Sequence, residues 1–341
     1  MKYANTDAKS ECPLCGSFDA KYLYRLSSHD ATRYLRSEDD KQFKPIKKII
    51  EGLWGKDYCE KFQCNDCKLI YVKPFVGGNE DFYSRMYDEE LPYPNAKSEF
   101  DYTLEDLKVR SIMRTKYNKE LSLLEIGAGK GAFLKLIPEY LIKKKNLFAN
   151  EISKHSAEAL KEMGIKNYPD LYSEDVDRRF DVIAFFGVIE HLDNLHKLFE
   201  RMSELLNDGG SIYLSTHETS KVFFFENNNA GLDVPPTHIS CWNRKSFDYL
   251  CELYNFEYVD DEYFNLSFMR KLINFGMGMF ELGKMKKGSV EDKINSMKSR
   301  KKRKFLIYCY LAMNLPYILY KTFGRTLVSK QWVHLKKRRK E

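Results

Sequence analysis

Two pairs of cysteines carry the clearest chemical signal in this 341-residue sequence. Two residues separate Cys12 from Cys15, and two separate Cys64 from Cys67. This spacing lets both sulfurs of a pair face one ion, and two such pairs complete a tetrahedral set of thiolates. Because that set leaves no coordination position open, we predict a structural zinc ion. Reduced thiols or a redox pair are the alternative.

The residues around these cysteine pairs indicate the cellular compartment of the protein and the shape of the cysteine-bearing segment. Lys2, Asp7 and Lys9 stand where a secretion signal would need an apolar run, so we expect a protein of the reducing cytosol. Forty-eight residues separate the two pairs, and we expect an insertion containing the charged stretch Arg33–Lys48 to loop out. The other cysteines lack metal-ligand spacing and are interpreted as small apolar residues: Cys59, Cys241, Cys251 and Cys309.

A glycine-rich turn follows the apolar run Leu121–Ile126. Glycines at Gly127, Gly129 and Gly131 would let a ligand approach the backbone and the N-terminus of a following helix. The same residues, with Ala132, also satisfy the dinucleotide pattern G-x-G-x-x-G/A. The turn therefore predicts a nucleotide-type cofactor and leaves a dehydrogenase as a rival.

Two carboxylates distinguish the dinucleotide of a dehydrogenase from another nucleotide-type cofactor. Glu125, two residues before the first glycine, would repel a pyrophosphate but attract the ammonium group of S-adenosylmethionine (SAM). Glu151 follows 26 residues later, at the end of the next apolar run, where a carboxylate can accept both ribose hydroxyls. A solvated loop acid is the alternative for Glu151. Together the two acids favour SAM.

The middle of the chain alternates strand-like and helix-like runs, which predicts a parallel sheet covered by helices. The Asp208–Gly210 stretch is expected to form a turn. We predict strands over 121–126, 146–152, 180–187, 211–216 and 257–264, and helices over 132–143, 156–163, 195–206 and 244–254.

Positive charge is concentrated at the C-terminal end. From Lys284 onward there are 18 Lys and Arg against three acidic residues. Because the whole chain has a formal net charge of +7, the first 283 residues carry −8. The asymmetry indicates a local partner for the tail, such as phosphates on nucleic acid, on lipid or on a nucleotide-linked substrate.

Several segments in order resemble a known family. Residues 125–131, 180–183, 188–192 and 205–216 look like successive motifs of class I SAM-dependent methyltransferases, over about residues 95–265. The N-terminal segments 12–16, 64–74 and 82–87 resemble the zinc-bearing leader of bacterial methyltransferases linked to sugar and polysaccharide modification. The resemblance implies an α/β fold with a Rossmann-like sheet, a zinc-binding module before it and a helical insertion after it.

The resemblance also implies roles for individual residues. The glycines of the turn would line the methionine end of SAM, with Gly187 beneath the sulfonium and Glu151 on the ribose. Asp170 and Leu171 would lie near the adenine. The implied cofactor contacts are Glu125, Gly127, Gly129, Gly131, Glu151, Asp170, Leu171 and Gly187, with Tyr83 and Tyr87 facing the cofactor or the acceptor.

One histidine is a candidate catalytic base. His238 lies in a Pro-x-His segment similar to one in the resembling enzymes, where a histidine near the acceptor can take a proton. The alternative is a loop histidine that only orders the turn. We expect His191, beside Glu190, to cap the turn under the cofactor. Metal catalysis is disfavoured because no second acid has the required spacing.

The tail supports three different expectations. Phe305–Tyr320 has 16 residues without a charge, too short an apolar run to cross a bilayer, and Asn314 and Pro316 interrupt it. We expect a buried helical insertion followed by a last strand over Arg325–Leu335. A helix in the membrane interface, with basic residues on anionic headgroups, is the second interpretation, and nucleic-acid binding is the third.

These observations predict three regions: a zinc-binding module over 1–78, a SAM-binding domain over 79–264 and a basic helical region over 265–341. The expected function is methyl transfer to a sugar, nucleotide-linked or within a surface glycan, or to a related small molecule. An RNA or protein methyltransferase and a non-catalytic SAM-binding protein are the alternatives. We expect a cytoplasmic protein whose basic region could reach the inner face of the membrane.

Overall fold

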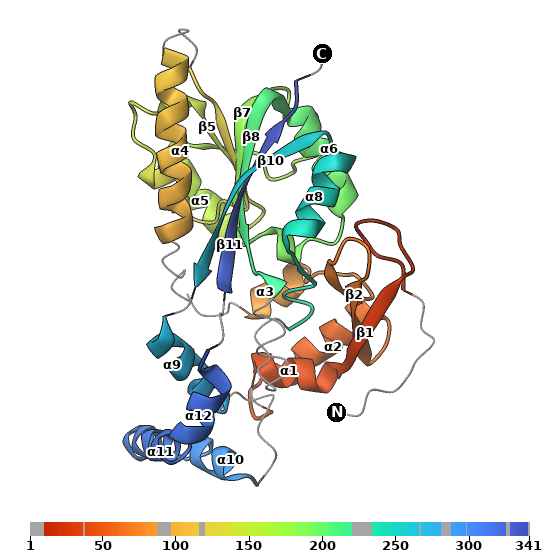
Figure 1. Cartoon of the computed structure of the whole chain (residues 1–341), viewed down its shortest axis with the longest axis vertical. Helices are drawn as coiled ribbons and strands as arrows, with labels where there is room; N and C mark the ends of the chain where they lie inside the picture. Colours follow the sequence, from red (N-terminus) through yellow and green to blue (C-terminus); the bar gives the residue numbers. More distant parts are fainter. Residues whose placement is uncertain are drawn as a thin grey trace.

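The computed structural model describes residues 10–36, 38–86, 97–115, 120–219, 234–265, 267–280, 288–297, 299–324 and 328–339. These residues form a seven-stranded sheet with helices on both faces, a smaller four-stranded sheet and a group of helices near the C-terminus (Figure 1). The α/β architecture with a mainly parallel sheet agrees with the sequence prediction.

The larger sheet has the order β10-β11-β8-β7-β4-β5-β6. The strands from β8 to β6 are parallel to their neighbours, and β11 runs antiparallel between β8 and β10. The strand expected near the C-terminus is therefore present, inserted inside the sheet. The strands are β4 (Leu123–Ile126), β5 (Leu147–Asn150), β6 (Lys166–Asn167), β7 (Phe180–Phe186), β8 (Leu206–Thr216), β10 (Phe256–Asn265) and β11 (Val328–Lys337).

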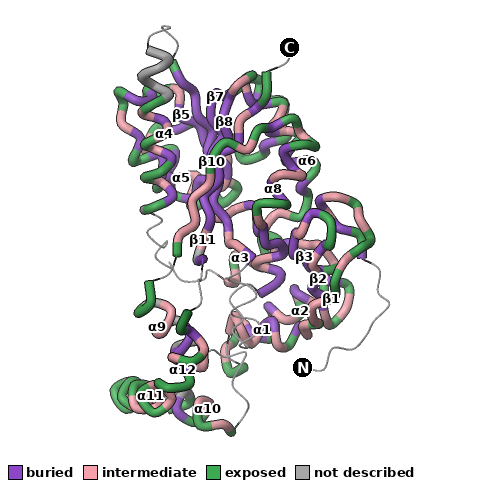
Figure 2. The backbone as a smooth tube through the Cα atoms, in the orientation of Figure 1, coloured by how far each residue is buried: buried purple, intermediate pink, exposed green. Residues whose placement is uncertain are grey.

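The central strands are buried on both faces. All four residues of β4 are buried, as are the first six of β7, which explains why both are mostly apolar in the sequence, with Glu125 and Asp181 as buried exceptions. Figure 2 shows this buried centre, with exposed residues on the outer sides of the helices. The covering elements are α4 (Lys97–Thr115), α5 (Lys154–Glu162), α6 (Leu195–Leu205), α8 (Arg244–Leu253) and the short 3₁₀ helices η1 (Leu134–Leu136), η2 (Lys144–Asn146) and η3 (Ile189–His191).

The helix predicted over 132–143 is wrong. The chain forms only the 3₁₀ turn η1 there, and Ile137 then adopts an extended conformation with ψ of 114°. Pro138 explains the difference because proline disfavours the helical conformation of the preceding residue and supplies no N–H. The apolar residues nevertheless pack inward, and Phe133 and Leu134 are buried.

The turn predicted over Asp208–Gly210 is also wrong in part. These residues belong to β8, which already pairs with β7 at Leu206. The register shifts between Phe180 and Val182, so the extra residues are absorbed as an irregularity of the strand. Gly209, with φ of +71°, supplies the left-handed backbone that this irregularity needs.

The smaller sheet has the order β1-β2-β3-β9 and joins segments far apart in sequence. β9 comes from beyond residue 239, yet it pairs with β3. The expected insertion between the cysteine pairs is present, but it folds into two helices instead of an open loop. The elements are β1 (Ala20–Ser27), α1 (Ser28–Leu35), α2 (Phe43–Trp54), β2 (Tyr58–Cys64), β3 (Ile70–Lys73), α3 (Glu80–Met86) and β9 (Ser240–Cys241).

Between β10 and β11, the described residues form four helices that project away from the sheet (Figure 1). The expectation of a buried helical insertion is wrong, because only Ile318 and Thr322 are buried among residues 301–322. In the described part of the chain, no helix has both the length and the apolar character to cross a membrane. The helices are α9 (Phe268–Gly278), α10 (Val290–Asn295), α11 (Arg300–Met313) and α12 (Leu315–Thr322).

Candidate functional site

The candidate residues lie where parallel strands end at one edge of the larger sheet. The glycine-rich turn follows β4, Glu151 follows β5, Glu190 follows β7 and His217 follows β8. The strand order reverses at β4, which has β5 on one side and β7 on the other. Ligands bind at this edge and this reversal point in open α/β sheets.

The backbone of the turn after β4 requires glycine. Gly127 has φ of +66°, and a Cβ atom there would lie 2.6 Å from Cγ2 of Val188. Gly131, with φ of +72°, would place a Cβ 2.9 Å from the sulfur of Met163. A side chain at either position would therefore disturb both the turn and its neighbours.

Glu125 is buried on β4, and the only charged group among the described residues that shifts its pKa is another carboxylate, Glu151. The side chain of Glu125 is 4% exposed, and Oε2 has no hydrogen-bond partner among the described residues. Burial, and then the nearby charge of Glu151, raise the pKa of Glu125 well above its usual range. A cationic ligand at this edge would satisfy the orphaned oxygen, which is the fit expected for the ammonium group of SAM.

Glu151 joins the two loops on either side of β5. Its Oε2 accepts a hydrogen bond from the N–H of Gly129 at 2.8 Å, and its Oε1 accepts one from the N–H of Ser153 at 2.7 Å. Asn167 fixes the backbone of Glu151 from both sides. Because a carboxylate can accept about four hydrogen bonds, capacity remains for ribose hydroxyls.

The residues assigned to the adenine follow β6. Asp170 lines an open hollow formed by residues 166–170, 173–175 and 177, whereas Leu171 is buried in the main core. Gly187, assigned to the sulfonium, follows β7 with φ of +67° and donates its N–H to the carbonyl of Ser215. Their contacts with a cofactor stay predictions.

A carboxylate and two imidazoles meet at the ends of β7 and β8. A carboxylate oxygen of Glu190 and one ring nitrogen each of His217 and His238 all lie within 4.8 Å of one another. Glu190 is 2% exposed and accepts a hydrogen bond from the hydroxyl of Thr216 at 3.0 Å. Burial opposes its ionisation, but the surrounding histidines outweigh that effect and lower the pKa of Glu190.

His191 lies next to this cluster and is held in one orientation. Its Nδ1 donates to the carbonyl of Thr237 and lies 3.2 Å from the hydroxyl of Tyr83. The rings of His191 and His238 are 4.8 Å apart. Burial lowers the pKa of His191. Tyr83 therefore lies beside His191, its contact with a cofactor or acceptor stays a prediction, and Tyr87 lies outside the described residues.

His217 was not identified from the sequence. His217 directly follows Thr216, the last residue of β8, just as Glu151 directly follows the last residue of β5. Its ring lies 4.7 Å from that of His238. A search for polar residues directly after apolar strands would have found His217, whereas its proximity to His238 is a tertiary contact that spacing in the sequence does not indicate.

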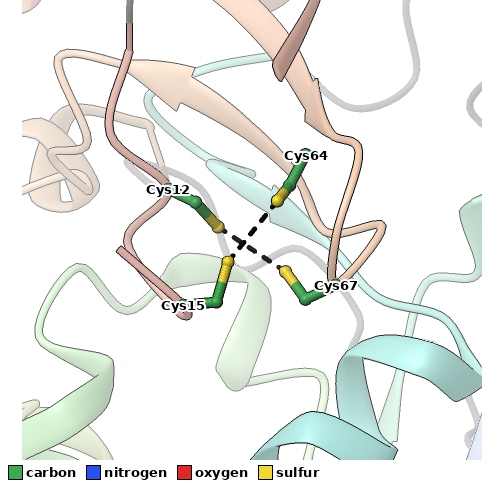
Figure 3. A group of neighbouring side chains, drawn as sticks. All are labelled: Cys12, Cys15, Cys64 and Cys67. Carbon is green, nitrogen blue, oxygen red and sulfur yellow. Dashed lines mark hydrogen bonds between the residues drawn. The ribbon is translucent and has the colours of Figure 1, made fainter. Parts of the chain in front are cut away.

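The four predicted zinc ligands converge (Figure 3). The sulfur of Cys12 lies 3.6 Å from that of Cys67, and the sulfur of Cys15 lies 3.5 Å from that of Cys64. These separations exceed the S–S bond of about 2.0 Å in a disulfide. They approach the roughly 3.8 Å edge of a tetrahedron with metal–sulfur bonds of about 2.3 Å. The cluster thus fits one tetrahedral ion.

Both cysteine loops have the same backbone form. Cys12 N–H donates to the carbonyl of Ser17, and Cys64 N–H donates to that of Leu69, five residues later in each case. The residue after the second cysteine is left-handed in both, with φ of +71° at Gly16 and +62° at Lys68. Lys68 therefore occupies a position that favours glycine.

The cysteine-bearing module holds the loop that carries His238. Val72 N–H of β3 donates to the carbonyl of Ile239, and Gly78 N–H donates to that of Pro236. On the opposite side, Ile239 N–H donates to the carbonyl of Glu190 at 2.8 Å. His238 is thus positioned by hydrogen bonds to both the module and the larger sheet.

Comparison with known proteins identifies the class. Residues 92–261, about half of the chain, match the family described as a methyltransferase domain. No curated protein matches the chain. This segment is a methyltransferase domain, and the protein is an enzyme that uses SAM as methyl donor.

Solved structures similar to this chain include three methyltransferases. A SAM-dependent methyltransferase from Archaeoglobus fulgidus is 16% identical, with a TM-score of 0.39, and the match covers 70% of this chain and 98% of that one. Coclaurine N-methyltransferase bound to N-methylheliamine and S-adenosylhomocysteine (SAH) is 14% identical, with a TM-score of 0.43 and coverage of 90% and 92%. The plantazolicin methyltransferase with a substrate analogue and SAH is 14% identical, with a TM-score of 0.40 and coverage of 72% and 88%.

Glu125 provides a direct test of how this edge binds SAM. Replacing Glu125 with alanine is expected to cost about 1.5–3 kcal/mol of SAM affinity, roughly 10- to 150-fold, because a hydrogen bond to a charged group is lost. Since burial raises the pKa of Glu125, wild-type affinity should also weaken as the pH falls and the carboxylate becomes protonated. Isothermal titration calorimetry measures both effects.

Glu120→Gln is the matched control. Glu120 precedes the same strand but is half-exposed and paired with Lys143 and Lys145 at the surface. Its substitution should leave SAM affinity unchanged. Equal affinity in Glu125→Ala and wild type, or tight NAD binding without SAM binding, would contradict the assignment of Glu125.

Proposed function

We propose that the enzyme transfers a methyl group from SAM to a sugar, either nucleotide-linked or part of a surface glycan. The cluster of Glu190, His217 and His238 supports this most strongly. A sugar hydroxyl or an activated sugar carbon is a weak acid, so its methylation needs a base, whereas a neutral amine needs none to attack. An imidazole next to a buried carboxylate is suited to that proton transfer.

The roles of the residues follow from their positions. SAM supplies a methyl group on a sulfonium that the acceptor can attack in line. Glu125 would hold the ammonium group and Glu151 the ribose, which fixes the donor at the sheet edge. His238 would accept the proton of the acceptor. Glu190 would stabilise the imidazolium formed, and His191 would stay neutral because burial lowers its pKa.

The cysteine cluster has a separate, structural role in the proposal. The residues that would hold zinc are Cys12, Cys15, Cys64 and Cys67, with no fifth ligand needed. Hydrogen bonds from β3 to the loop of His238 then connect the zinc module to the acceptor side of the site. Zinc would hold this loop in place and take no part in the chemistry.

The alternatives differ in what they require of the site. An RNA or protein methyltransferase would need basic residues around the acceptor, whereas Lys301–Lys304 begin α11 in the projecting helices. A non-catalytic SAM-binding protein would not need an ionised Glu190 beside two histidines. Both remain outcomes of the test below.

Acceptor screening with methyl-labelled SAM tests the proposal. The acceptors are nucleotide-linked sugars, polyisoprenyl-linked oligosaccharides, total RNA and unmodified proteins, each incubated with the purified chain. We expect label to appear in the sugar fraction only. Label in RNA or protein would overturn the acceptor class, and SAM binding without transfer to any acceptor would favour the non-catalytic alternative.

A further inference from the structure

The helices between β10 and β11 bury little of their apolar surface. Phe275 and Ile318 form a small core of their own, with Leu272, Met279 and Leu311 packed against it. Many other large apolar and aromatic side chains are outside this core. Single exposed apolar residues are ordinary, but a group of them on neighbouring helices needs a partner.

The exposed group spans three helices and their ends. On α9 and α12, Phe268 and Phe323 are both more than 40% exposed, although their rings lie only 6.5 Å apart. Tyr320 is 76% exposed and Met313 75% exposed. The full set is Phe268, Met269, Ile273, Phe305, Tyr308, Met313, Leu315, Tyr317, Tyr320 and Phe323.

One face of α11 combines this apolar surface with positive charge. Lys301, Lys304, Phe305 and Tyr308 are all exposed, and their spacing of three and four residues places them on one side of the helix. The lysines begin the face and the aromatic rings follow within two turns. The Nζ atom of Lys304 lies 5.9 Å from the Tyr308 ring.

Positive charge is concentrated at the start of α11. Arg300–Lys304 is a run of five basic residues, and the first turn contains no acidic residue. A helix N-terminus already carries partial positive charge, so this run repels both itself and the helix dipole. An external anionic surface would relieve that repulsion.

The acidic residues of the neighbouring α10 have other partners. The carboxylate of Glu291 accepts a hydrogen bond from the hydroxyl of Tyr310. Asp292 accepts one from the N–H of Gly288 at 2.7 Å. The first of these bonds joins α10 to α11, and the second lies at the start of α10 itself.

We propose that α11 and α12, with the exposed end of α9, bind the surface of an anionic membrane. The basic start of α11 would contact lipid headgroups, and the exposed Phe, Met and Tyr side chains would enter the interface between headgroups and acyl chains. Tyrosine suits this depth because its ring is apolar and its hydroxyl polar. The helices lie on the membrane and do not cross it.

Other occupants fit the surface less well. A second copy of the chain would bring five basic residues against an equally basic surface. Nucleic acid would pair with the charges and could stack on some rings, but it would leave Met269, Ile273 and Met313 exposed. An anionic lipid surface matches both the charge and the apolar side chains.

Vesicle flotation with the full-length protein tests the proposal, using phosphatidylcholine vesicles with and without phosphatidylglycerol. We expect binding only with the anionic lipid, falling steeply as salt is raised. Lys301→Glu with Lys304→Glu should reduce partitioning by about 30-fold or more, since each basic residue contributes roughly fivefold. Phe305→Ser with Tyr308→Ser should also reduce partitioning by at least tenfold.

Matched controls are available on the sheet domain. Lys135→Glu removes an exposed lysine and Tyr140→Ser an aromatic ring that is 77% exposed, both far from α11 in sequence, and neither should change flotation. SAM affinity reports the folding of every variant and is independent of the acceptor. Because the readout is lipid binding, failure of the sugar proposal would leave this result unaffected.

Three outcomes would overturn the proposal. They are no flotation at any lipid composition, flotation that the α11 variants leave unchanged, and retention of RNA in place of vesicles. A concentration-dependent dimer that Phe305→Ser with Tyr308→Ser abolishes, without vesicle binding, would assign the surface to a second copy.

Discussion

Replacing Cys64 with serine is expected to release zinc and unfold the N-terminal module. Cys64 is fully buried at the end of β2, and it belongs to the same apolar core as Phe62, Leu69 and Tyr71. Zinc contributes on the order of 10–16 kcal/mol of apparent binding free energy in zinc-finger peptides. That contribution is comparable to or larger than the whole stability of a typical domain, about 5–15 kcal/mol.

The loss should extend to the catalytic site. The hydroxyl of Ser246 donates to the carbonyl of Cys67, and the side-chain amide of Asn243 donates to that of Lys68, so the start of α8 is fastened to the second cysteine pair. The loop of His238 is bonded to β3 of the same module. We therefore expect reduced methyl transfer in Cys64→Ser.

Elemental analysis, thermal unfolding and limited proteolysis measure these effects. Cys59→Ser is the control, because Cys59 is 1% exposed in the same module but lies outside the sulfur cluster. It should keep zinc and lose about 1–3 kcal/mol, the cost of burying an unsatisfied hydroxyl. Protein purified without chelator that contains no zinc, or zinc content unchanged in Cys64→Ser, would refute the metal assignment.

The sequence predicted the sheet because its central strands are buried on both faces. Short apolar runs such as Leu123–Ile126 and Phe180–Phe186 indicate core strands, and polar residues near their carboxyl ends are candidates for the site. Glu125 within β4 and Glu151 directly after β5 were selected for this reason, and their contacts with a cofactor stay predictions. The cysteine cluster was predictable from spacing alone, since two-residue spacers fix each pair locally.

Other features depend on contacts that spacing does not encode. Pairing of β9 with β3 joins residues near 240 to residues near 70, and no local pattern indicates it. The hydrogen bond from Ile239 N–H to the carbonyl of Glu190 then brings the adjacent His238 close to Glu190. The sequence left the exposure of α11 and α12 open between a buried insertion and a membrane-interface helix, because an apolar run such as Phe305–Tyr320 looks the same whether the chain or an external partner covers it.

His238→Ala is expected to lower the turnover number by about 10²- to 10⁴-fold, the range for loss of a general base. SAM affinity should change little, because His238 lies in the loop before β9 and the residues proposed to hold SAM follow β4 and β5. Steady-state kinetics with the acceptor found by screening, together with SAM calorimetry, separate the two quantities.

His196→Ala is the matched control for this substitution. His196 is exposed on α6, where its Nδ1 lies 2.6 Å from the hydroxyl of Tyr254, and it does not belong to the cluster around Glu190. Its loss should leave turnover unchanged. If His238→Ala also kept its turnover number, His238 would only order the loop, and the proton would have to pass to His191 or His217. Because those rings lie 4.8 and 4.7 Å from the His238 ring, the same kinetic comparison in His191→Ala and His217→Ala would then identify the base.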